Sequence, residues 1–391
     1  MIKRELEAKL KKAARQYPVV GIIGPRQSGK TTLSKAVFGS YPYVSLEKPS
    51  ELEFAIGDPE GFLAQFPKNV IIDEVQRAPK LFSYIQIIVD QAQKPGMFVL
   101  TGSQNFELLA KISQSLAGRA ALQTLLPFSF GELERGGLLP ARLPDLLFRG
   151  GYPRIYDKKL NATDWLSNYV TAYLERDVRS IKNVGDLSTF QRFLKMCAFR
   201  SGKILNLSSL ANDCGITHNT AKAWLSILEA SYIIFLLSPY YNNFNKRLIK
   251  APKLYFCDTG LLCYLLGLRR AEDVKHHPEI GSIFETFVVG EIAKMFAGQG
   301  RAPALYFWRD KMGREIDCLI ETGRKAIPLE IKAGQTISND FFTNLNYWNS
   351  LSKSKPAEAL VVYGGDASQK RSNGRVLSWR DLSEVEKLIL T

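Results

Sequence analysis

The chain has 391 residues, a formal net charge of +14, and hydrophobic and charged fractions of 46% and 23%. These fractions are ordinary for a folded globular protein, and the length allows two or three domains with separate cores. Five scattered cysteines without a C-x-x-C pair and only three histidines argue against a disulfide framework or a zinc site. No apolar run approaches the roughly 18 residues that cross a bilayer, and segment 1–15 lacks the apolar core of a signal peptide, so we expect a cytoplasmic protein.

The basic charge is concentrated in the middle of the chain. Residues 151–250 hold 14 basic and 7 acidic residues, against 19 and 14 in residues 1–150 and 19 and 17 in residues 251–391. A basic excess fits a polyanionic partner such as DNA, although a solvated surface would show the same balance. Charge alone therefore leaves both interpretations open.

A glycine-rich segment near the N-terminus matches a phosphate-binding loop (P-loop) in full. Segment 24–32 reads GPRQSGKTT, follows the apolar run Val19–Ile23 and precedes a helical pattern. The glycines turn backbone N–H groups toward a phosphate chain, Lys30 supplies positive charge to the β- and γ-phosphates, and the hydroxyl of Thr31 can hold Mg²⁺. The sequence predicts a nucleotide site formed by Gly24, Gln27, Ser28, Gly29, Lys30, Thr31 and Thr32.

Further apolar runs separated by helical patterns predict a parallel βαβ sheet, and two of them end in polar residues. Residues 69–74 read NVIIDE, a Walker B pattern in which Asp73 would hold the Mg²⁺ shell and Glu74 would polarise the attacking water. Residues 98–104 read FVLTGSQ, so that Ser103 or Gln104 could sense the γ-phosphate or position water, or could equally form hydrogen bonds within a loop. Parallel strands end at one edge of a sheet, where ligands bind.

Arg119 follows the second of these strands by one helix length. It could reach a γ-phosphate in its own subunit or in the neighbouring subunit of a homo-oligomer. An arginine at a helix end is also a common partner of the helix dipole. The sequence does not distinguish these roles.

Four segments together resemble one family: GPRQSGKTTL, IIDEVQRAP, LTGSQNFELL and SLAGRAALQTLLPFSFGEL. They are similar to prokaryotic AAA+-type ATPases that have an AAA_14-like P-loop core and a C-terminal DUF4143 region, and the resemblance covers almost the whole chain. It implies an α/β fold with an AAA+ core, here residues 1–135, and ATP as the nucleotide. It implies no cellular role.

The middle of the chain predicts a helical connector, residues 136–185, and a winged helix, residues 186–250. A helix, a turn at Gly215 and a second helix capped by Thr217 form a helix-turn-helix pattern, and two short strands follow. In a DNA-binding role, the second helix and the wing would contact DNA through His218, Asn219, Lys222, Lys246 and Arg247. The alternative is a winged helix that only packs between domains.

The sequence of residues 251–391 predicts a helix at 280–296, followed along the chain by three strands at 305–332. Asp317 lies in the second strand, and Glu330 and Lys332 lie on one face of the third because side chains alternate along a strand. With Glu285 on the helix, this set resembles the PD-(D/E)xK, restriction-endonuclease-like superfamily. The resemblance implies Mg²⁺ held by Asp317 and Glu330, with Lys332 activating water. The alternative is the same fold with these charges as an inert ion-pair network.

We therefore expect an AAA+-type ATPase that uses ATP and Mg²⁺, coupled to a winged helix and a nuclease-like domain that acts on DNA. The first alternative is an ATP-dependent signalling switch that oligomerises and binds protein partners without nuclease activity. The second is a P-loop kinase, which the adjacent carboxylates of Asp73 and Glu74 disfavour because they suit hydrolysis.

Overall fold

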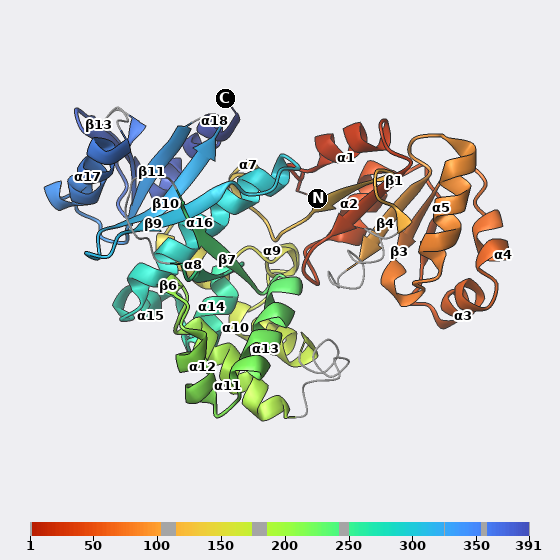
Figure 1. Ribbon diagram of the computed structural model, residues 1–391, viewed down its shortest axis with the longest axis horizontal. Helices are drawn as coiled ribbons and strands as arrows, with labels where there is room; N and C mark the ends of the chain where they lie inside the picture. Colours follow the sequence, from red (N-terminus) through yellow and green to blue (C-terminus); the bar gives the residue numbers. More distant parts are fainter. Residues whose placement is uncertain are drawn as a thin grey trace. The chain divides into compact units, whose positions relative to one another are not determined.

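The computed structural model describes residues 2–102, 115–173, 186–241, 250–323, 325–352 and 358–390. It divides into two compact units (Figure 1). The first unit contains Met1–Phe128, Ala230–Tyr232 and Ala297–Ala302, and the second contains Ser129–Glu229, Ile233–Phe296 and Pro303–Thr391. In the described part of the chain, no helix combines the length and hydropathy needed to cross a membrane.

The first unit is built on a five-stranded parallel sheet with strand order β2-β3-β4-β1-β5. Its strands are β1 (Val19–Ile23), β2 (Tyr43–Ser45), β3 (Val70–Asp73), β4 (Phe98–Gly102) and β5 (Ala120–Thr124). The first four confirm the predicted apolar runs. The edge strand β5 was not predicted, because its sequence AALQT is half-buried and lacks the β-branched run that marks a central strand.

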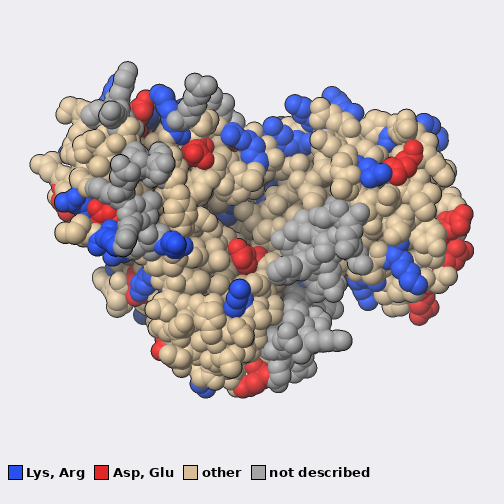
Figure 2. Space-filling model, viewed as in Figure 1, with Lys and Arg blue, Asp and Glu red and all other residues tan. Residues whose placement is uncertain are grey.

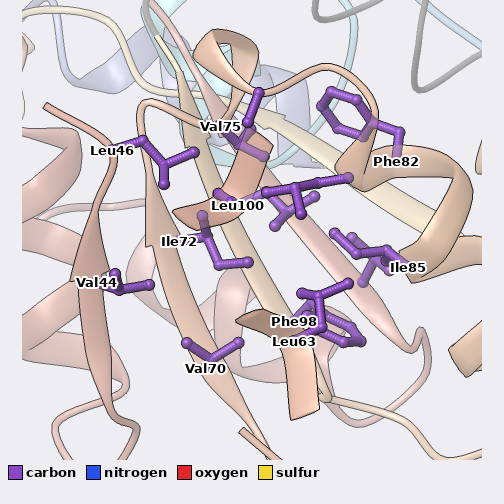
Figure 3. Close-up of a cluster of buried hydrophobic side chains, with 14 of the residues drawn as sticks. Val44, Leu46, Leu63, Val70, Ile72, Val75, Phe82, Ile85, Phe98 and Leu100 are labelled. Carbon is purple, nitrogen blue, oxygen red and sulfur yellow. The ribbon is translucent and has the colours of Figure 1, made fainter. Parts of the chain in front are cut away.

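Helices cover both faces of this sheet, and the alternation of side chains along the strands explains why. Val70, Ile72, Phe98 and Leu100 point to one face and pack with Phe82 and other apolar residues of one buried cluster (Figure 3). Val20, Ile22, Ile71 and Val99 point to the other face and pack with Leu10 and Leu33. The helices of the unit are α1 (Glu7–Ala14), α2 (Lys30–Val37), α3 (Pro49–Gly57), α4 (Pro59–Ala64), η1 (Val75–Arg77) and α5 (Leu81–Ala92). Strands buried on both faces read as continuous apolar runs, as in this sequence.

The second unit contains a nine-stranded mixed sheet with order β13-β14-β12-β11-β10-β9-β7-β8-β6. Its strands are β6 (Lys203–Ile204), β7 (Ile234–Pro239), β8 (Lys253–Phe256), β9 (Leu305–Arg309), β10 (Glu315–Thr322), β11 (Lys325–Lys332), β12 (Leu360–Tyr363), β13 (Gln369–Arg371) and β14 (Gly374–Ser378). The predicted strands at 305–332 are confirmed. Strand β7 pairs in parallel with β9, so one sheet extends from the helical region into the C-terminal region.

Three helices and three strands of the second unit form a compact helical module. Its helices are α11 (Leu187–Ala198), α12 (Leu207–Cys214) and α13 (His218–Ala230). Strand β8 lies between β6 and β7 and is antiparallel to both. The rings of Phe190 and Phe193 pack against Trp224 at centroid distances of 5.0 and 5.4 Å. Gly215 ends α12 with a φ of +69°, and Thr217 caps the next helix as predicted.

The other helices of the second unit complete its layers. They are α7 (Phe130–Arg135), α8 (Leu143–Arg149), α9 (Pro153–Asp157), α10 (Ala162–Tyr173), α14 (Thr259–Leu265), α15 (Ala271–His276), α16 (Ile280–Gly298), η3 (Asn339–Phe342), α17 (Thr343–Ser352), η5 (Trp379–Asp381) and α18 (Glu384–Leu390). Asp258 caps α14 by accepting a hydrogen bond from the Leu261 amide. The division of this unit into connector, winged helix and nuclease-like domain stays a prediction.

Candidate functional site

The P-loop forms the turn between β1 and α2, and its glycines are required by geometry. Gly24 has a φ of +147°, and a Cβ atom built there would lie 2.1 Å from the carbonyl oxygen of Leu125. Gly29 precedes α2 in a left-handed conformation with a φ of +96°. Gln27 is exposed and also has a positive φ, of 63°. The chain can make this turn only because two of its positions lack a side chain.

The charged side chain of the P-loop is folded against the loop itself. Lys30 is 6% exposed, and its Nζ donates to the carbonyl oxygens of Gly24 at 3.0 Å and Pro25 at 2.8 Å. Ser28 is buried beneath the loop, whereas Thr32 is exposed on α2. The structure thus places Lys30 next to the backbone turn that would hold a phosphate chain.

The carboxylate of Asp73 at the end of β3 joins three other elements. Its Oδ2 accepts hydrogen bonds from the hydroxyls of Thr31 and Tyr43, both at 2.8 Å. Its Oδ1 accepts one from the hydroxyl of Thr101 at the end of β4. Asp73 is 6% exposed. The predicted pair of Thr31 and Asp73 therefore lies together, and both carry hard oxygen ligands of the kind that Mg²⁺ prefers.

Sequence reasoning missed two of the residues that hold Asp73. Burial and the hydrogen bond to Asp73 raise the pKa of Tyr43 to about 12, so its hydroxyl stays a donor across the physiological range. The position of Thr101 carried a readable signal, since it is a polar residue at the end of an apolar strand. The position of Tyr43 carried none, because only the fold brings β2 beside β3.

Glu74 directly follows Asp73 and has an unusual backbone conformation. Its φ of 56° and ψ of 41° lie in the left-handed region, where residues other than glycine are uncommon. Its carboxylate accepts a hydrogen bond from the side-chain amide of Gln76. Such conformations concentrate at functional sites. Glu74 thus follows directly on the last residue of β3, at the carboxyl edge of the sheet.

The remaining predicted nucleotide-site residues are Ser103, Gln104 and Arg119. Ser103 and Gln104 fall outside the described residues. Arg119 lies at the amino end of β5, because Ala120 pairs with Val19 and Thr124 pairs with Ile23. It forms an exposed ion pair with Asp90 of α5. Arg119 is thus one strand length, roughly 16 Å, from the P-loop edge of its own unit. A role of Arg119 in a neighbouring subunit stays a prediction.

In the second unit, strands β10 and β11 bring the predicted carboxylates together. The Nζ of Lys332 lies 2.6 Å from an oxygen of Glu330 and 3.9 Å from Oδ2 of Asp317. Oδ2 of Asp317 accepts a hydrogen bond from the Ile331 amide at 2.8 Å. Glu330 is 1% exposed, and its Oε1 has no hydrogen-bond partner among the described residues. Burial and the nearby Asp317 raise the pKa of Glu330 to about 8, while Lys332 opposes this rise.

Glu285 of α16 is held by residues that sequence reasoning missed. Its Oε1 accepts from the Nζ of Lys253 at 2.8 Å and from the hydroxyl of Tyr255 at 2.5 Å. Lys253 is 3% exposed and also lies 2.5 Å from an oxygen of Glu315. Burial raises the pKa of Glu285 to about 7, although Lys253 favours its charged form. The only signal was a lysine in the otherwise apolar strand KLYF.

No group of three or more His, Cys, Asp or Glu side chains within the described ranges is arranged to hold a metal ion. The candidate metal ligands therefore remain the pair Thr31 and Asp73 in the first unit and the pair Asp317 and Glu330 in the second. The free Oε1 of buried Glu330 fits a cation ligand. In Glu285, by contrast, Oε1 already accepts hydrogen bonds from Lys253 and Tyr255.

The residues predicted to bind DNA are only partly described. His218, Asn219 and Lys222 are exposed on α13, whose opposite side buries Trp224 and Leu228. Lys246 and Arg247 lie outside the described residues. On the face drawn in Figure 2, Lys and Arg side chains are dispersed among Asp and Glu rather than gathered into one patch. The structure therefore leaves DNA binding as a prediction.

Replacing Tyr43 by Phe is expected to weaken the hold on Asp73. A hydrogen bond to a charged group contributes about 1.5 kcal/mol or more, and we expect the Mg²⁺ concentration that half-saturates nucleotide binding to rise about tenfold. Titration of Mg²⁺ into protein and nucleotide measures this. Tyr41→Phe removes a hydroxyl two residues away as a matched control, and an equal effect in both variants would contradict the role of Tyr43.

Replacing Lys253 by Met is expected to destabilise the second unit by about 3–5 kcal/mol, because it leaves buried Glu285 with an uncompensated charge. Thermal unfolding measures the loss. Lys203→Met is the matched control, since the Lys203–Glu279 pair has a similar 2.7 Å separation but a lysine side chain that is 47% exposed. An exposed pair contributes about 0–1 kcal/mol, so similar losses in the two variants would show that burial of Lys253 is unimportant.

Three family models match consecutive parts of the chain. Residues 16–134 match the AAA domain, residues 140–272 a domain of unknown function (DUF8612), and residues 280–382 a second domain of unknown function (DUF4143). The AAA match and the P-loop confirm the predicted AAA-type core, and the DUF4143 match confirms the predicted C-terminal region. Neither match shows that this region is a nuclease.

Similar proteins were found among solved structures and among curated sequences. The Walker-type ATPase PABY2304 of Pyrococcus abyssi has a TM-score of 0.48 and 16% identity, over 68% of this chain and 96% of that one. AMPPCP-bound DnaA from Aquifex aeolicus has a TM-score of 0.30 and 17% identity, over 57% and 85%. The uncharacterized proteins Rv2008c of Mycobacterium tuberculosis and Mb2031c of Mycobacterium bovis are each 30% identical over 367 residues, which are 93% of this chain and 80% of theirs. The chain therefore belongs to the family of these mycobacterial proteins, with an AAA-type P-loop domain at its N-terminal end and a DUF4143 region at its C-terminal end.

Proposed function

We propose that the first unit binds ATP with Mg²⁺ and hydrolyses it, and that hydrolysis drives a second unit that acts on DNA. The observation that carries the ATPase part is the carboxylate of Asp73, which meets the hydroxyl of Thr31 at 2.8 Å beside the P-loop. A carboxylate at the end of one strand and a hydroxyl at the start of the P-loop helix are the two protein ligands of a nucleotide-bound Mg²⁺.

Each residue of this site has a distinct task. Backbone N–H groups at the start of α2 and the ammonium of Lys30 bind the phosphates. To do so, Lys30 leaves the carbonyl oxygens of Gly24 and Pro25 for phosphate oxygens. Mg²⁺, when bound, neutralises charge that develops on the phosphates. Thr31 and Asp73 would hold it, with Thr101 and Tyr43 orienting the carboxylate of Asp73.

Glu74 is the candidate general base. Water attacks the γ-phosphorus, the bond from that phosphorus to the bridging oxygen of ADP breaks, and the proton of the water passes to the carboxylate of Glu74. Gln76 holds this carboxylate from one side and so restricts its orientation. The products are ADP and inorganic phosphate.

Replacing Glu74 by Gln is expected to lower the rate of ATP hydrolysis at least about 100-fold, because the amide cannot accept the proton, while ATP binding persists. Phosphate release and equilibrium ATP binding are measured on the same protein. Glu60→Gln changes an exposed carboxylate on α4 and serves as the control. Hydrolysis at the wild-type rate by the Glu74 variant would contradict the proposed base.

The DNA-directed part of the proposal is supported by two features of the second unit. The elements follow the order of a winged helix: α11, β6, α12, α13, β7 and β8, with β8 between the other two strands. The recognition helix would be α13, which exposes His218, Asn219 and Lys222. The cluster of Asp317, Glu330 and Lys332 agrees with metal-assisted cleavage of a phosphodiester, for which the unpartnered Oε1 of Glu330 is a suitable metal ligand.

We expect the wild-type protein to cleave DNA with Mg²⁺ or Mn²⁺, and Asp317→Ala and Lys332→Ala to abolish cleavage. Gel analysis of labelled duplex and single-stranded DNA measures this. Cleavage that persists in both variants would exclude the proposed centre.

DNA binding is measured separately. Lys222→Ala is expected to reduce the slope of log affinity against log salt by about one, while Lys195→Ala, an exposed lysine on α11, leaves it unchanged. Absence of both cleavage and salt-dependent binding would favour the alternative, an ATP-dependent switch that binds protein partners.

A further inference from the structure

The segment that precedes α1 reaches the P-loop through one buried side chain. Arg4 is 8% exposed. Its Nη1 donates to the carbonyl oxygen of Ser28 at 2.8 Å, and its Nη2 donates to the carbonyl oxygen of Leu126 at 2.6 Å. The guanidinium carbon also lies 4.9 Å from the centre of the Phe128 ring. One planar fork therefore holds two backbone segments that are about a hundred residues apart in sequence.

The first of these hydrogen bonds holds a carbonyl of the phosphate cradle, by which we mean the P-loop backbone whose N–H groups would face the phosphates. A peptide group is planar and trans, so the N–H of Gly29 points away from the Ser28 carbonyl that Arg4 holds. Gly29 directly precedes α2, where a P-loop presents its N–H groups to phosphate. A cation on the carbonyl polarises this peptide group and makes its N–H a stronger donor. The hydrogen bond also fixes the orientation of the peptide plane.

The second hydrogen bond holds the segment by which the chain leaves the first unit. This exit segment, residues 125–128, follows β5, and the N-terminal stretch of the first unit ends at Phe128. It also touches the P-loop directly, because the Leu125 amide donates to the carbonyl of Ile23 at 2.7 Å and the Leu125 carbonyl packs on Gly24. Leu6 and Leu10 are buried and anchor α1, so the backbone from which Arg4 extends is fixed.

We propose that Arg4 is a positioning residue that joins the phosphate cradle of the P-loop to the exit segment. Nucleotide binding changes the Ser28–Gly29 peptide, and the shared guanidinium passes this change to the carbonyl of Leu126. Arg4 thereby links occupancy of the nucleotide site to the chain that leads into the second unit. This proposal rests on the nucleotide-binding function proposed above.

Arg4→Gln and Arg4→Lys test the proposal, because a neutral amide and a single ammonium both lack the charged fork that holds two carbonyls. Calorimetry measures the Kd for ADP with Mg²⁺, and hydrogen exchange measures protection of residues 125–128 with and without ADP. We expect both variants to bind ADP at least about tenfold more weakly, a loss of about 1.4 kcal/mol, and to lose ADP-dependent protection of the exit segment. The Lys variant keeps the charge and carries the test if the Gln variant fails to fold.

Two controls separate positioning from stability. Arg15→Gln changes an exposed arginine at the end of α1 and should alter neither measurement. Leu10→Ala should lower the melting temperature while ADP-dependent protection remains. Arg4 variants that keep wild-type ADP affinity and protection would overturn the proposal, as would an equal loss of protection in the Leu10 variant. Failure of the wild-type protein to bind ADP would instead contradict the nucleotide-binding function.

Discussion

The carboxylate of Asp73 is the point on which the first unit depends. It accepts hydroxyl hydrogen bonds from the P-loop helix, from β2 and from β4, and it lies at the end of a fully buried strand. A buried carboxylate is costly unless its oxygens are paired, so the three hydroxyls both stabilise the charge and fix its direction. The parallel sheet makes this possible, because all of its strands end at the same edge. In the proposed ATPase, the same hydrogen bonds would orient a carboxylate oxygen toward Mg²⁺.

The carboxylates of the second unit are held in a different way. Asp73 is surrounded by neutral hydroxyls, whereas Glu285 and Glu330 are paired with the ammonium groups of Lys253 and Lys332. Burial raises the pKa of both glutamates toward neutrality, and their lysine partners oppose this. Within this cluster the two glutamates differ: Oε1 of Glu285 accepts from two donors, while Oε1 of Glu330 has no hydrogen-bond partner in the described part of the chain. The predicted nuclease-like role of Glu285, Asp317, Glu330 and Lys332 stays a prediction.

Backbone contacts and the side chain of Arg4 join the P-loop to the exit segment. Gly24 packs on the carbonyl of Leu125, and Arg4 ties the carbonyls of Ser28 and Leu126 together. Leu125, which supplies this contact, directly follows the edge strand β5, and the arginine precedes the first helix. Neither Leu125 nor Arg4 belongs to the P-loop or the Walker B pattern. Both nevertheless connect the P-loop with the exit segment. Coupling of this kind needs a physical connection, and here it consists of two hydrogen bonds from one side chain.

The sequence by itself determined the local features of this protein. The P-loop, the adjacent carboxylates of Asp73 and Glu74, the first four strands and the period-2 pairing of Glu330 with Lys332 are all readable because motif spacing and side-chain alternation are short-range properties. Only the tertiary structure decided which distant residues meet. The fold places Tyr43 and Thr101 beside Asp73, Lys253 and Tyr255 beside Glu285, and Arg4 beside the P-loop. It places Arg119 at the amino end of β5, whereas the P-loop follows the carboxyl end of β1. Strand order and register determine these contacts, and neither can be read from any single segment of the chain.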